Sequence, residues 1–153
     1  MENLMVKKIF DNAILPTRGT DKSAGLDLYA YIPEDKLDPE GKLNINPHET
    51  VPVSSGIAIG LPPNTFGGIV ARSGMAKNRH LAPANKLGVV DRDYTGEVII
   101  LLHNHSNDIQ SIENGERIAQ LLVLPYINTN VLEVNTLQET LRGDGGFGST
   151  GEK

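Results

Sequence analysis

The chemically richest stretch of the chain is its C-terminal tail, residues 142–151, with the sequence RGDGGFGSTG. Glycines let the backbone adopt positive φ and approach a ligand closely, which points amide N–H groups at anionic oxygens. Arg142 adds a charge suited to phosphate, and Ser149 and Thr150 add hydroxyl donors. Phe147 buries nothing locally, and a nucleobase would give its ring a face to stack on. Composition alone leaves a low-complexity terminus as an equal alternative.

A second stretch of interest is Arg72-Ser73-Gly74, which follows the apolar segment 66–70. A strand that ends in these residues and enters a helical turn offers a guanidinium, a hydroxyl and free N–H groups, which together suit phosphate oxygens. The same pattern is also typical of an ordinary serine N-cap. We predict a short helix over 73–79, the one helix that the sequence indicates.

Two stretches carry carboxylates. Asp91 and Asp93 are two residues apart, so in a strand they share a face, and an acid in a partly dry cleft accepts a proton from water. Such a pair is also typical of an acidic turn at a hairpin. Asp27 alternates with apolar neighbours and is predicted to face inward. A lone carboxylate inside a strand is either paired structurally or bound to a cation.

Short strands are the elements that must position these residues, because the apolar period is two almost everywhere. Residues 51–61 alternate around Ser-Ser-Gly at 54–56, which predicts a hairpin. The continuous apolar runs 97–102 and 118–124 predict strands covered on both faces. Turn residues at short intervals then favour an all-β jelly roll or barrel with one short helix.

Composition excludes several classes of function. The 153 residues, 39% of them hydrophobic, suffice for one sizeable core. A net charge of −5 without a basic run argues against nucleic-acid polymers as partners. The absence of cysteine rules out disulfides and thiolate metal sites, and the four histidines lack zinc-site spacing. No apolar run reaches membrane length and no signal peptide is evident, so we expect a soluble intracellular protein with no membrane partner.

The core pattern fades after about residue 127. We therefore divide the chain into a β-barrel core at 1–127 and a C-terminal arm at 128–153. A glycine-rich arm cannot pack a core alone, so it is either disordered or becomes ordered on a ligand or a neighbouring subunit.

In their order along the chain, five stretches resemble the five motifs of the trimeric dUTPase family. The stretches are AGLDL at 24–28, RSG at 72–74, GVVDRDYTGE at 88–97, ERIAQ at 116–120 and RGDGGFGSTG at 142–151. The last is highly specific and the third nearly so. The resemblance covers about residues 21–151, almost the whole chain.

The resemblance implies a distorted jelly-roll (β-clip barrel) subunit in a homotrimer. Three active sites would be shared between subunits, and the C-terminal arm would close over a neighbour's pocket. The implied activity is the Mg²⁺-assisted hydrolysis of dUTP to dUMP and pyrophosphate. That reaction keeps uracil out of DNA and supplies dUMP for dTMP synthesis.

The resemblance also assigns roles to individual residues. Asp91 would hold and deprotonate the water that attacks the α-phosphorus, and Asp27 would hold magnesium through coordinated water. Tyr94 would lie under the deoxyribose and leave no room for a 2′-hydroxyl. The other substrate-binding residues implied are Arg72, Ser73, Gly74 and Gln120 for the phosphate chain, Asn85, Gly88, Val89 and Val90 in a predicted hairpin at 85–91 for the uracil edge, Arg142, Gly148, Ser149 and Thr150 for the γ-phosphate, and Phe147 for stacking on uracil.

Two other functions compete with this interpretation. A dCTP deaminase of related fold would change the base instead of the phosphate chain, but no acid outside the motifs is placed for that chemistry. A non-catalytic jelly-roll module could keep the glycine-rich arm, but it has no reason to keep Asp27, Asp91 and Arg142 together.

Overall fold

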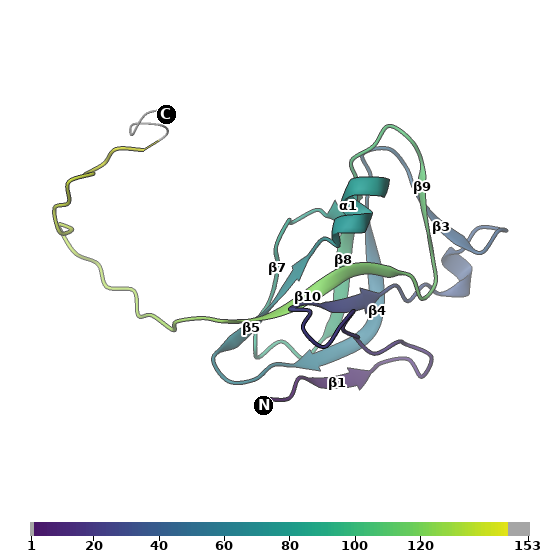
Figure 1. Ribbon diagram of the computed structural model, residues 1–153, viewed down its shortest axis with the longest axis horizontal. Helices are drawn as coiled ribbons and strands as arrows, with labels where there is room; N and C mark the ends of the chain where they lie inside the picture. Colours follow the sequence, from purple (N-terminus) through teal and green to yellow (C-terminus); the bar gives the residue numbers. More distant parts are fainter. Residues whose placement is uncertain (1, 147–153) are drawn as a thin grey trace.

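The computed structural model describes residues 2–146, which form three antiparallel sheets with one short α-helix (Figure 1). The all-β fold class is thereby confirmed. The strands are β1 (Met5–Lys8), β2 (Leu26–Tyr29), β3 (Lys42–Ile45), β4 (Thr50–Gly60), β5 (Thr65–Val70), β6 (Leu81–Pro83), β7 (Gly88–Val90), β8 (Glu97–Asn104), β9 (Gln110–Glu113) and β10 (Arg117–Pro125); the helices are α1 (Ser73–Arg79) and the 3₁₀-helix η1 (Glu34–Lys36).

Two four-stranded sheets enclose the core. Their strand orders are β1-β4-β8-β6 and β2-β10-β5-β7, and β3 pairs with β9 in a separate ribbon. The inward positions are aliphatic, as the scarcity of aromatic residues requires. Fully buried side chains come from both large sheets and include Leu28, Ile57, Leu81, Ile100, Ile118 and Leu121. Burial of this apolar surface is the main stabilising contribution to the fold.

The hairpin predicted for residues 51–61 is wrong, because β4 is one strand of 11 residues. Its register against β8 shifts between Ser54 and Ala58, which marks a β-bulge. Gly56 has a φ of +68°, and its N–H donates to a carboxylate oxygen of Glu97 at 2.9 Å. The Ser54 hydroxyl donates to the same carboxylate. Glu97, 41 residues away, therefore accepts the hydrogen bond of the Gly56 N–H, so β4 continues through the bulge.

The two continuous apolar runs differ in burial. In β10 the consecutive residues Ile118 and Ala119 are both buried where the register against β2 shifts, and Leu122, Val123 and Leu124 are partly buried. Two covered faces stay a prediction for this strand. In β8 the burial alternates, and Ile99 and Leu101 remain 48% and 43% exposed. The prediction of two covered faces is therefore wrong for β8 in the single chain. One apolar face of this strand is exposed to solvent.

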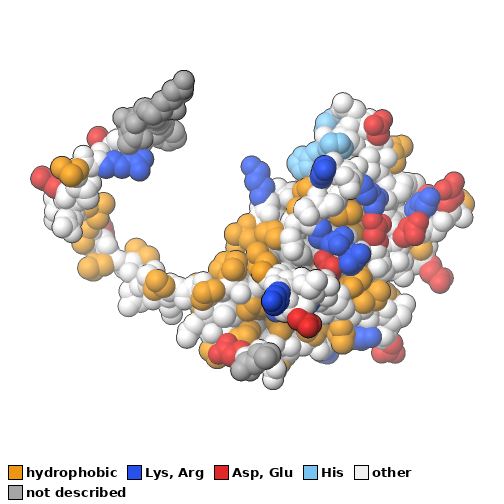
Figure 2. Space-filling model, in the orientation of Figure 1, with side chains coloured by type: hydrophobic (Ala, Val, Ile, Leu, Met, Phe, Trp, Pro, Cys, Tyr) orange, Lys and Arg blue, Asp and Glu red, His pale blue; other side chains and the backbone are white. Residues whose placement is uncertain are grey.

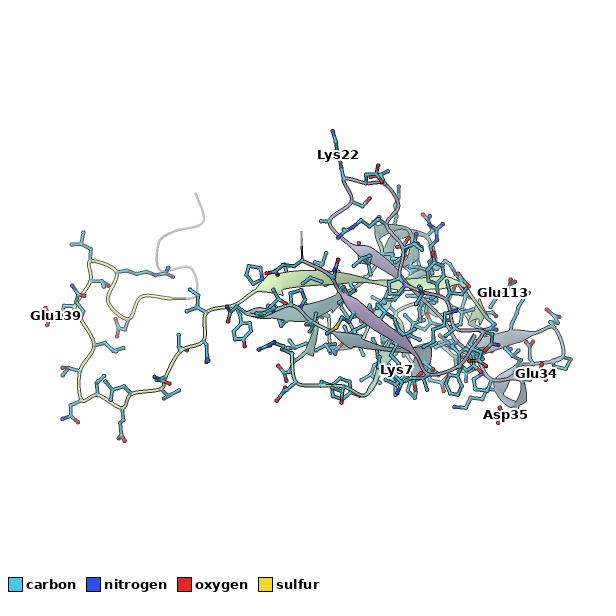
Figure 3. The ribbon with its side chains drawn as sticks, turned by 90° about the horizontal axis from the view of Figure 1, so that it is seen from below. Lys7, Lys22, Glu34, Asp35, Glu113 and Glu139 are labelled. Carbon is cyan, nitrogen blue, oxygen red and sulfur yellow. The ribbon has the colours of Figure 1, made fainter. Side chains whose placement is uncertain are left out.

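The chain leaves the two sheets after β10. Residues 126–146 contain neither helix nor strand and extend away from the rest of the molecule (Figure 1). Glu139 on this segment lies at the opposite end of the molecule from Glu34 and Asp35 of η1 (Figure 3). Apolar side chains along the segment face solvent (Figure 2); the most exposed are Ile127, Val131, Leu132, Leu137 and Leu141. No helix in the described part of the chain is long and apolar enough to span a membrane.

Candidate active site

The predicted helix at 73–79 is confirmed as α1, which begins after a two-residue connection from the end of β5 at Val70. Arg72 is the extended residue before the helix, and no side chain caps the first turn. Ser73 is therefore the first helical residue and not the N-cap. Met75 is 4% exposed and anchors the helix to the core. The left-handed His80 (φ 53°) ends the helix.

Asp27 lies at the centre of a cluster with two arginines. Arg72 Nε donates to Asp27 Oδ1 at 2.7 Å, and Arg117 Nη1 donates to Asp27 Oδ2 at 3.2 Å. Arg72 Nη1 also donates to the carbonyl of Arg117 at 3.2 Å. The Asp27 side chain is 14% exposed, whereas that of Arg117 is 50% exposed. The inward orientation predicted for Asp27 is confirmed, and both carboxylate oxygens are paired with arginines; the cation-binding role stays a prediction.

Gln120 joins the cluster from β10, where it pairs with Asp27 of β2. Its Nε2 donates to the carbonyl of Ala71 at 2.9 Å. A Cβ on Gly25 would lie 2.5 Å from Gln120 Oε1, so only glycine lets Gln120 take this position. A Cβ on Gly74, in contrast, would meet nothing within 4 Å. Packing within the chain therefore gives no reason for glycine at position 74.

Asp91 and Asp93 lie in the turn after β7, where both are exposed. The prediction that they share the face of a strand is wrong, because β7 ends at Val90. The Asp91 carbonyl accepts the N–H of Tyr94 at 3.1 Å, and the Tyr94 hydroxyl donates to the carbonyl of Glu97 at 2.9 Å. A Cβ on Gly96 would lie 2.5 Å from that hydroxyl oxygen. The turn thus holds the tyrosine ring against a glycine, with Asp91 at its start.

A cavity of about 240 Å³ opens beside this turn. Its walls include Asn85, Gly88, Val89, Val90, Asp91 and Tyr94, together with residues 97–101 of β8. This volume is below the ~300–1,000 Å³ typical of sites that enclose a whole ligand. Val89 and Asp91 also line a second, wider hollow of about 900 Å³.

Residues 85–91 do not form the predicted hairpin. The strands on either side of the turn belong to different sheets, since β6 pairs with β8 and β7 pairs with β5. The segment is a turn that crosses from one sheet to the other. Lys86 takes a left-handed conformation there (φ 58°), and a Cβ on Gly88 would lie 3.1 Å from Asn85 Nδ2.

Asp27 and Asp91 lie far apart within one chain. Their strands, β2 and β7, are the two edges of the sheet β2-β10-β5-β7, which separates them by roughly 14 Å. Asp27 is in register with Gln120, which pairs with Val70 of β5. Asp91 follows Val90, which pairs with Gly67, so Asp91 is level with a position on β5 four residues from Val70. That offset adds roughly 13 Å along the strands, so the separation is roughly 19 Å. The chain therefore holds two half-sites.

The C-terminal motif is described only at its beginning. Arg142 lies on the exposed segment, and its Nε donates to the carbonyl of Gly145 at 2.8 Å. Phe147, Gly148, Ser149 and Thr150 lie outside the described residues.

Arg117 is a site residue to which the sequence reasoning gave no role. It lies within the fourth motif, so its position was visible, but its pairing with Asp27 joins residues 90 positions apart. A second omission is the role of Glu97, whose carboxylate satisfies the bulge in β4 from a position inside the third motif.

Metal ligands are sparse. The residues from 2 to 146 include no group of three or more His, Cys, Asp or Glu side chains that could hold a metal ion. His103 and His105 pack edge to face, with ring centroids 4.4 Å apart, and His103 Nδ1 lies 2.8 Å from the Thr50 hydroxyl. Burial, with smaller contributions from His105 and His48, lowers the pKa of His103 from its ordinary value.

Comparison with known proteins identifies the family of the chain. The sequence model of the dUTPase family matches residues 11–151. The chain is 41% identical to the deoxyuridine 5′-triphosphate nucleotidohydrolase of Escherichia phage T5, over 91% of this chain and 93% of that protein. It is also 41% identical to the enzyme of the same name from Hydrogenobaculum, over 98% and 99% of the two chains. The chain belongs to the dUTPase family.

Solved structures show the same fold. The Staphylococcus bacteriophage 80alpha dUTPase with dUPNHPP superposes with a TM-score of 0.84 at 24% identity, over 99% of both chains. A mutant dUTPase from phage phi11 of S. aureus, described for its coordination of a structural Mg(II) ion, gives a TM-score of 0.77 at 20% identity, over 90% of this chain and all of that one.

Proposed function

We propose that this chain hydrolyses dUTP to dUMP and pyrophosphate in active sites shared between identical subunits. The observation that carries the proposal is the division of the family motifs into two half-sites. One is a cluster of guanidinium, carboxylate and amide groups around Asp27. The other is a small cavity with a carboxylate, Asp91, in its wall.

The separation of the half-sites supports a homotrimer. Two groups roughly 19 Å apart cannot both contact one α-phosphate, so a second copy must supply one of them. The apolar face left open at Ile99 and Leu101 adjoins the cavity wall and offers a surface for that copy. Three copies around one axis would complete three identical sites, because a head-to-tail contact that closes makes a ring.

Asp91 is the proposed general base. Its carboxylate accepts a proton from water, the water oxygen bonds to the α-phosphorus, and the bond from that phosphorus to the bridging oxygen breaks to release pyrophosphate. The exposed turn leaves the carboxylate accessible to water. Proton transfer of this kind contributes ~10²–10⁴-fold to a rate. Positioning and neutralisation of the phosphates supply the remainder.

The Asp27 cluster is the proposed phosphate site. Arg72, Ser73, Gly74 and Gln120 would bind the phosphate chain, with the arginine turning from Asp27 to the substrate. The open space beside Gly74 supports close approach of a ligand there. Charge-assisted bonds from guanidinium to phosphate are the strong class of hydrogen bond.

Magnesium fits this cluster only through water. Both carboxylate oxygens of Asp27 already accept bonds from arginines, and the described residues offer no group of three or more possible metal ligands around it. Mg²⁺ keeps several of its waters and binds through substrate phosphates plus one or two carboxylates, so Asp27 would hold it through a coordinated water. When bound, the ion supplies neutralisation of the triphosphate charge.

The cavity is the proposed base and sugar site. Backbone groups of Asn85, Gly88, Val89 and Val90 would read the uracil edge, where cytosine would leave buried polar groups mismatched. The Tyr94 ring, packed against Gly96, would lie under the deoxyribose and exclude a 2′-hydroxyl.

The C-terminal segment is the proposed lid. In this view residues 1–127 form the core and 128–153 an arm that closes over a neighbour's site. The row of exposed apolar side chains on the arm supports docking on another subunit. Arg142, Gly148, Ser149 and Thr150 would bind the γ-phosphate, and Phe147 would stack on uracil. In the cell, the reaction would keep uracil out of DNA and supply dUMP for dTMP synthesis.

Pyrophosphate release tests the proposal. With magnesium, dUTP should give dUMP and pyrophosphate, while dTTP, UTP and dCTP should give little. Asp91→Asn should lower kcat by ~10²–10⁴-fold and keep the affinity for dUPNHPP, the imido analogue of dUTP. Loss of that affinity would make Asp91 a structural residue. Conversion of dCTP to dUTP by the wild-type protein would identify a deaminase instead.

A further inference from the structure

Arg79, the last residue of α1, fastens the helix to the β9–β10 turn. Its Nη1 donates to Glu116 Oε1, and its Nη2 donates to the backbone carbonyl of Ser111. The Arg79 and Glu116 side chains are each 28% exposed, so the ion pair is largely shielded from solvent. The family motifs quoted above include Glu116 but not Arg79.

Glu116 is itself held in place. Its second carboxylate oxygen accepts the N–H of Glu113 at 3.1 Å, which closes the β9–β10 turn. Its carbonyl accepts the N–H of Ala30 at 2.8 Å, which joins the turn to the end of β2. Arg79 therefore attaches α1 to a part of the chain that is already fixed from two sides.

The helix is tied to the same stretch at both ends. Arg72, just before α1, donates to the carbonyl of Arg117, and Arg79, at the end of α1, binds the carboxylate of Glu116. A helix of seven residues separates the two attachments by about 10 Å. If Arg72 turns to the phosphates, its attachment weakens. The attachment through Arg79 lies outside the phosphate cluster and is kept.

We propose that Arg79 is a positioning residue for the phosphate chain of the substrate. Arg79 holds α1 against the β9–β10 turn. The strand that follows this turn, β10, carries Gln120, so Arg79 keeps Arg72 and Ser73 aligned with Gln120. This inference rests on the proposed function. It assigns Arg79 an effect on phosphate affinity and no contact with substrate.

The proposal distinguishes Arg79 from a residue that only stabilises the fold. Removing it leaves one Glu116 oxygen and the Ser111 carbonyl without their partner, which costs stability whatever the function. A positioning role adds a selective effect. Ligands with phosphates should lose affinity, and deoxyuridine, which has the base and sugar alone, should not.

The test compares four variants in the full-length protein: Arg79→Met, Arg79→Lys, Glu116→Gln and the double variant Arg79→Met/Glu116→Gln. Lys77→Met is the matched control, because Lys77 is an exposed cation on the same helix without a hydrogen bond or ion pair to any described residue. The measurements are kcat, KM for dUTP, Kd for dUPNHPP, Ki for deoxyuridine and Tm.

Arg79→Met should raise KM for dUTP and Kd for dUPNHPP by ~10-fold, with kcat and the deoxyuridine Ki changed by less than ~2-fold. Arg79→Lys should recover part of this loss, because an ammonium reaches one of the two acceptors. Glu116→Gln should act in the same direction. The double variant should lose no more than Arg79→Met alone, because one interaction cannot be removed twice. Lys77→Met should match the wild type.

Equal losses for dUPNHPP and deoxyuridine, or a Kd for dUPNHPP that stays at the wild-type value, would overturn the positioning role. If Arg79→Met does not fold, Arg79→Lys and Glu116→Gln decide, and unchanged phosphate affinity in both would also overturn it. A wild-type protein that binds dUPNHPP without hydrolysing dUTP would refute the proposed function instead, and the binding measurements would still test Arg79.

Discussion

The two half-sites are built in different ways. Around Asp27 the geometry is set by bonds between side chains, with Arg72 and Arg117 both paired to one carboxylate. Around the cavity it is set by the backbone and by glycines, as where Tyr94 packs against Gly96. In the proposed function, the cluster would exchange internal ion pairs for bonds to phosphate, and the cavity would receive the base without such an exchange. One half-site is therefore defined by its paired charged side chains, and the other by the shape that its backbone and glycines give the cavity.

The difference has an energetic consequence. The Arg72 side chain is 26% exposed and already paired with Asp27, so it has lost part of its hydration before a phosphate binds. The cavity would contribute selectivity instead, because its buried polar groups would lack hydrogen-bond partners when the wrong base binds. The phosphate half-site should therefore control affinity, and the cavity should control selectivity.

Gly25→Ala should disturb only the phosphate half-site. Of the substitutions at Gly25, Tyr94 and His103, it should have the largest effect on activity. The new Cβ would lie 2.5 Å from Gln120 Oε1, so the Gln120 side chain must shift, which should weaken its bond to the carbonyl of Ala71. We expect kcat/KM for dUTP to fall by ~100-fold, with the ratio of dUTP to UTP turnover unchanged. Gly19→Ala is the control, since its Cβ would make only an ordinary contact at 3.6 Å. A parallel loss of nucleotide selectivity would contradict the separation of roles.

Tyr94→Ala should do the reverse. Without the ring, a 2′-hydroxyl gains room, so the preference for dUTP over UTP should fall by ~10-fold while the affinity for pyrophosphate stays the same. Steady-state kinetics with both nucleotides measure the ratio. Tyr94→Phe keeps the ring and loses the bond to Glu97, so its ratio should stay near that of the wild type. An unchanged ratio in Tyr94→Ala would remove this residue from sugar selection.

His103, outside both half-sites, should affect only stability. Burial lowers its pKa in the folded state, so the unfolded chain takes up the proton first as pH falls. The stability that depends on neutral His103 is therefore lost as pH drops through the ordinary histidine value towards the lower folded one. Unfolding by urea at about pH 8 and about pH 6 should show a smaller difference for His103→Gln than for the wild type. Equal differences would show that this pKa shift has no effect on folding.

How much the sequence predicted depends on the range of each interaction. The short helix at 73–79 and the inward carboxylate at Asp27 follow from local patterns, and both are present. The continuous β4 could not be predicted, because the partner of Gly56 is Glu97, 41 residues away. The ion pair of Asp27 with Arg117 has the same origin.

The open face of β8 shows a second kind of limit. Its run of apolar residues predicts two covered faces, and within one chain only one is covered. An apolar run predicts that both faces are covered, but it does not indicate whether the cover comes from the same chain. If Ile99 and Leu101 contact another subunit, the same pattern describes the assembly and not the single chain.

Activity from mixed subunits tests the sharing of the active site most directly. Asp91→Asn removes one half-site and Arg72→Ala the other, so each variant alone should be nearly inactive. In trimers with both kinds of subunit, about one site in three would combine an intact Asp91 from one chain with an intact Arg72 from another, so equal random mixing should restore about one quarter of wild-type activity. Mixed trimers that stay as inactive as the separate variants would contradict the shared site.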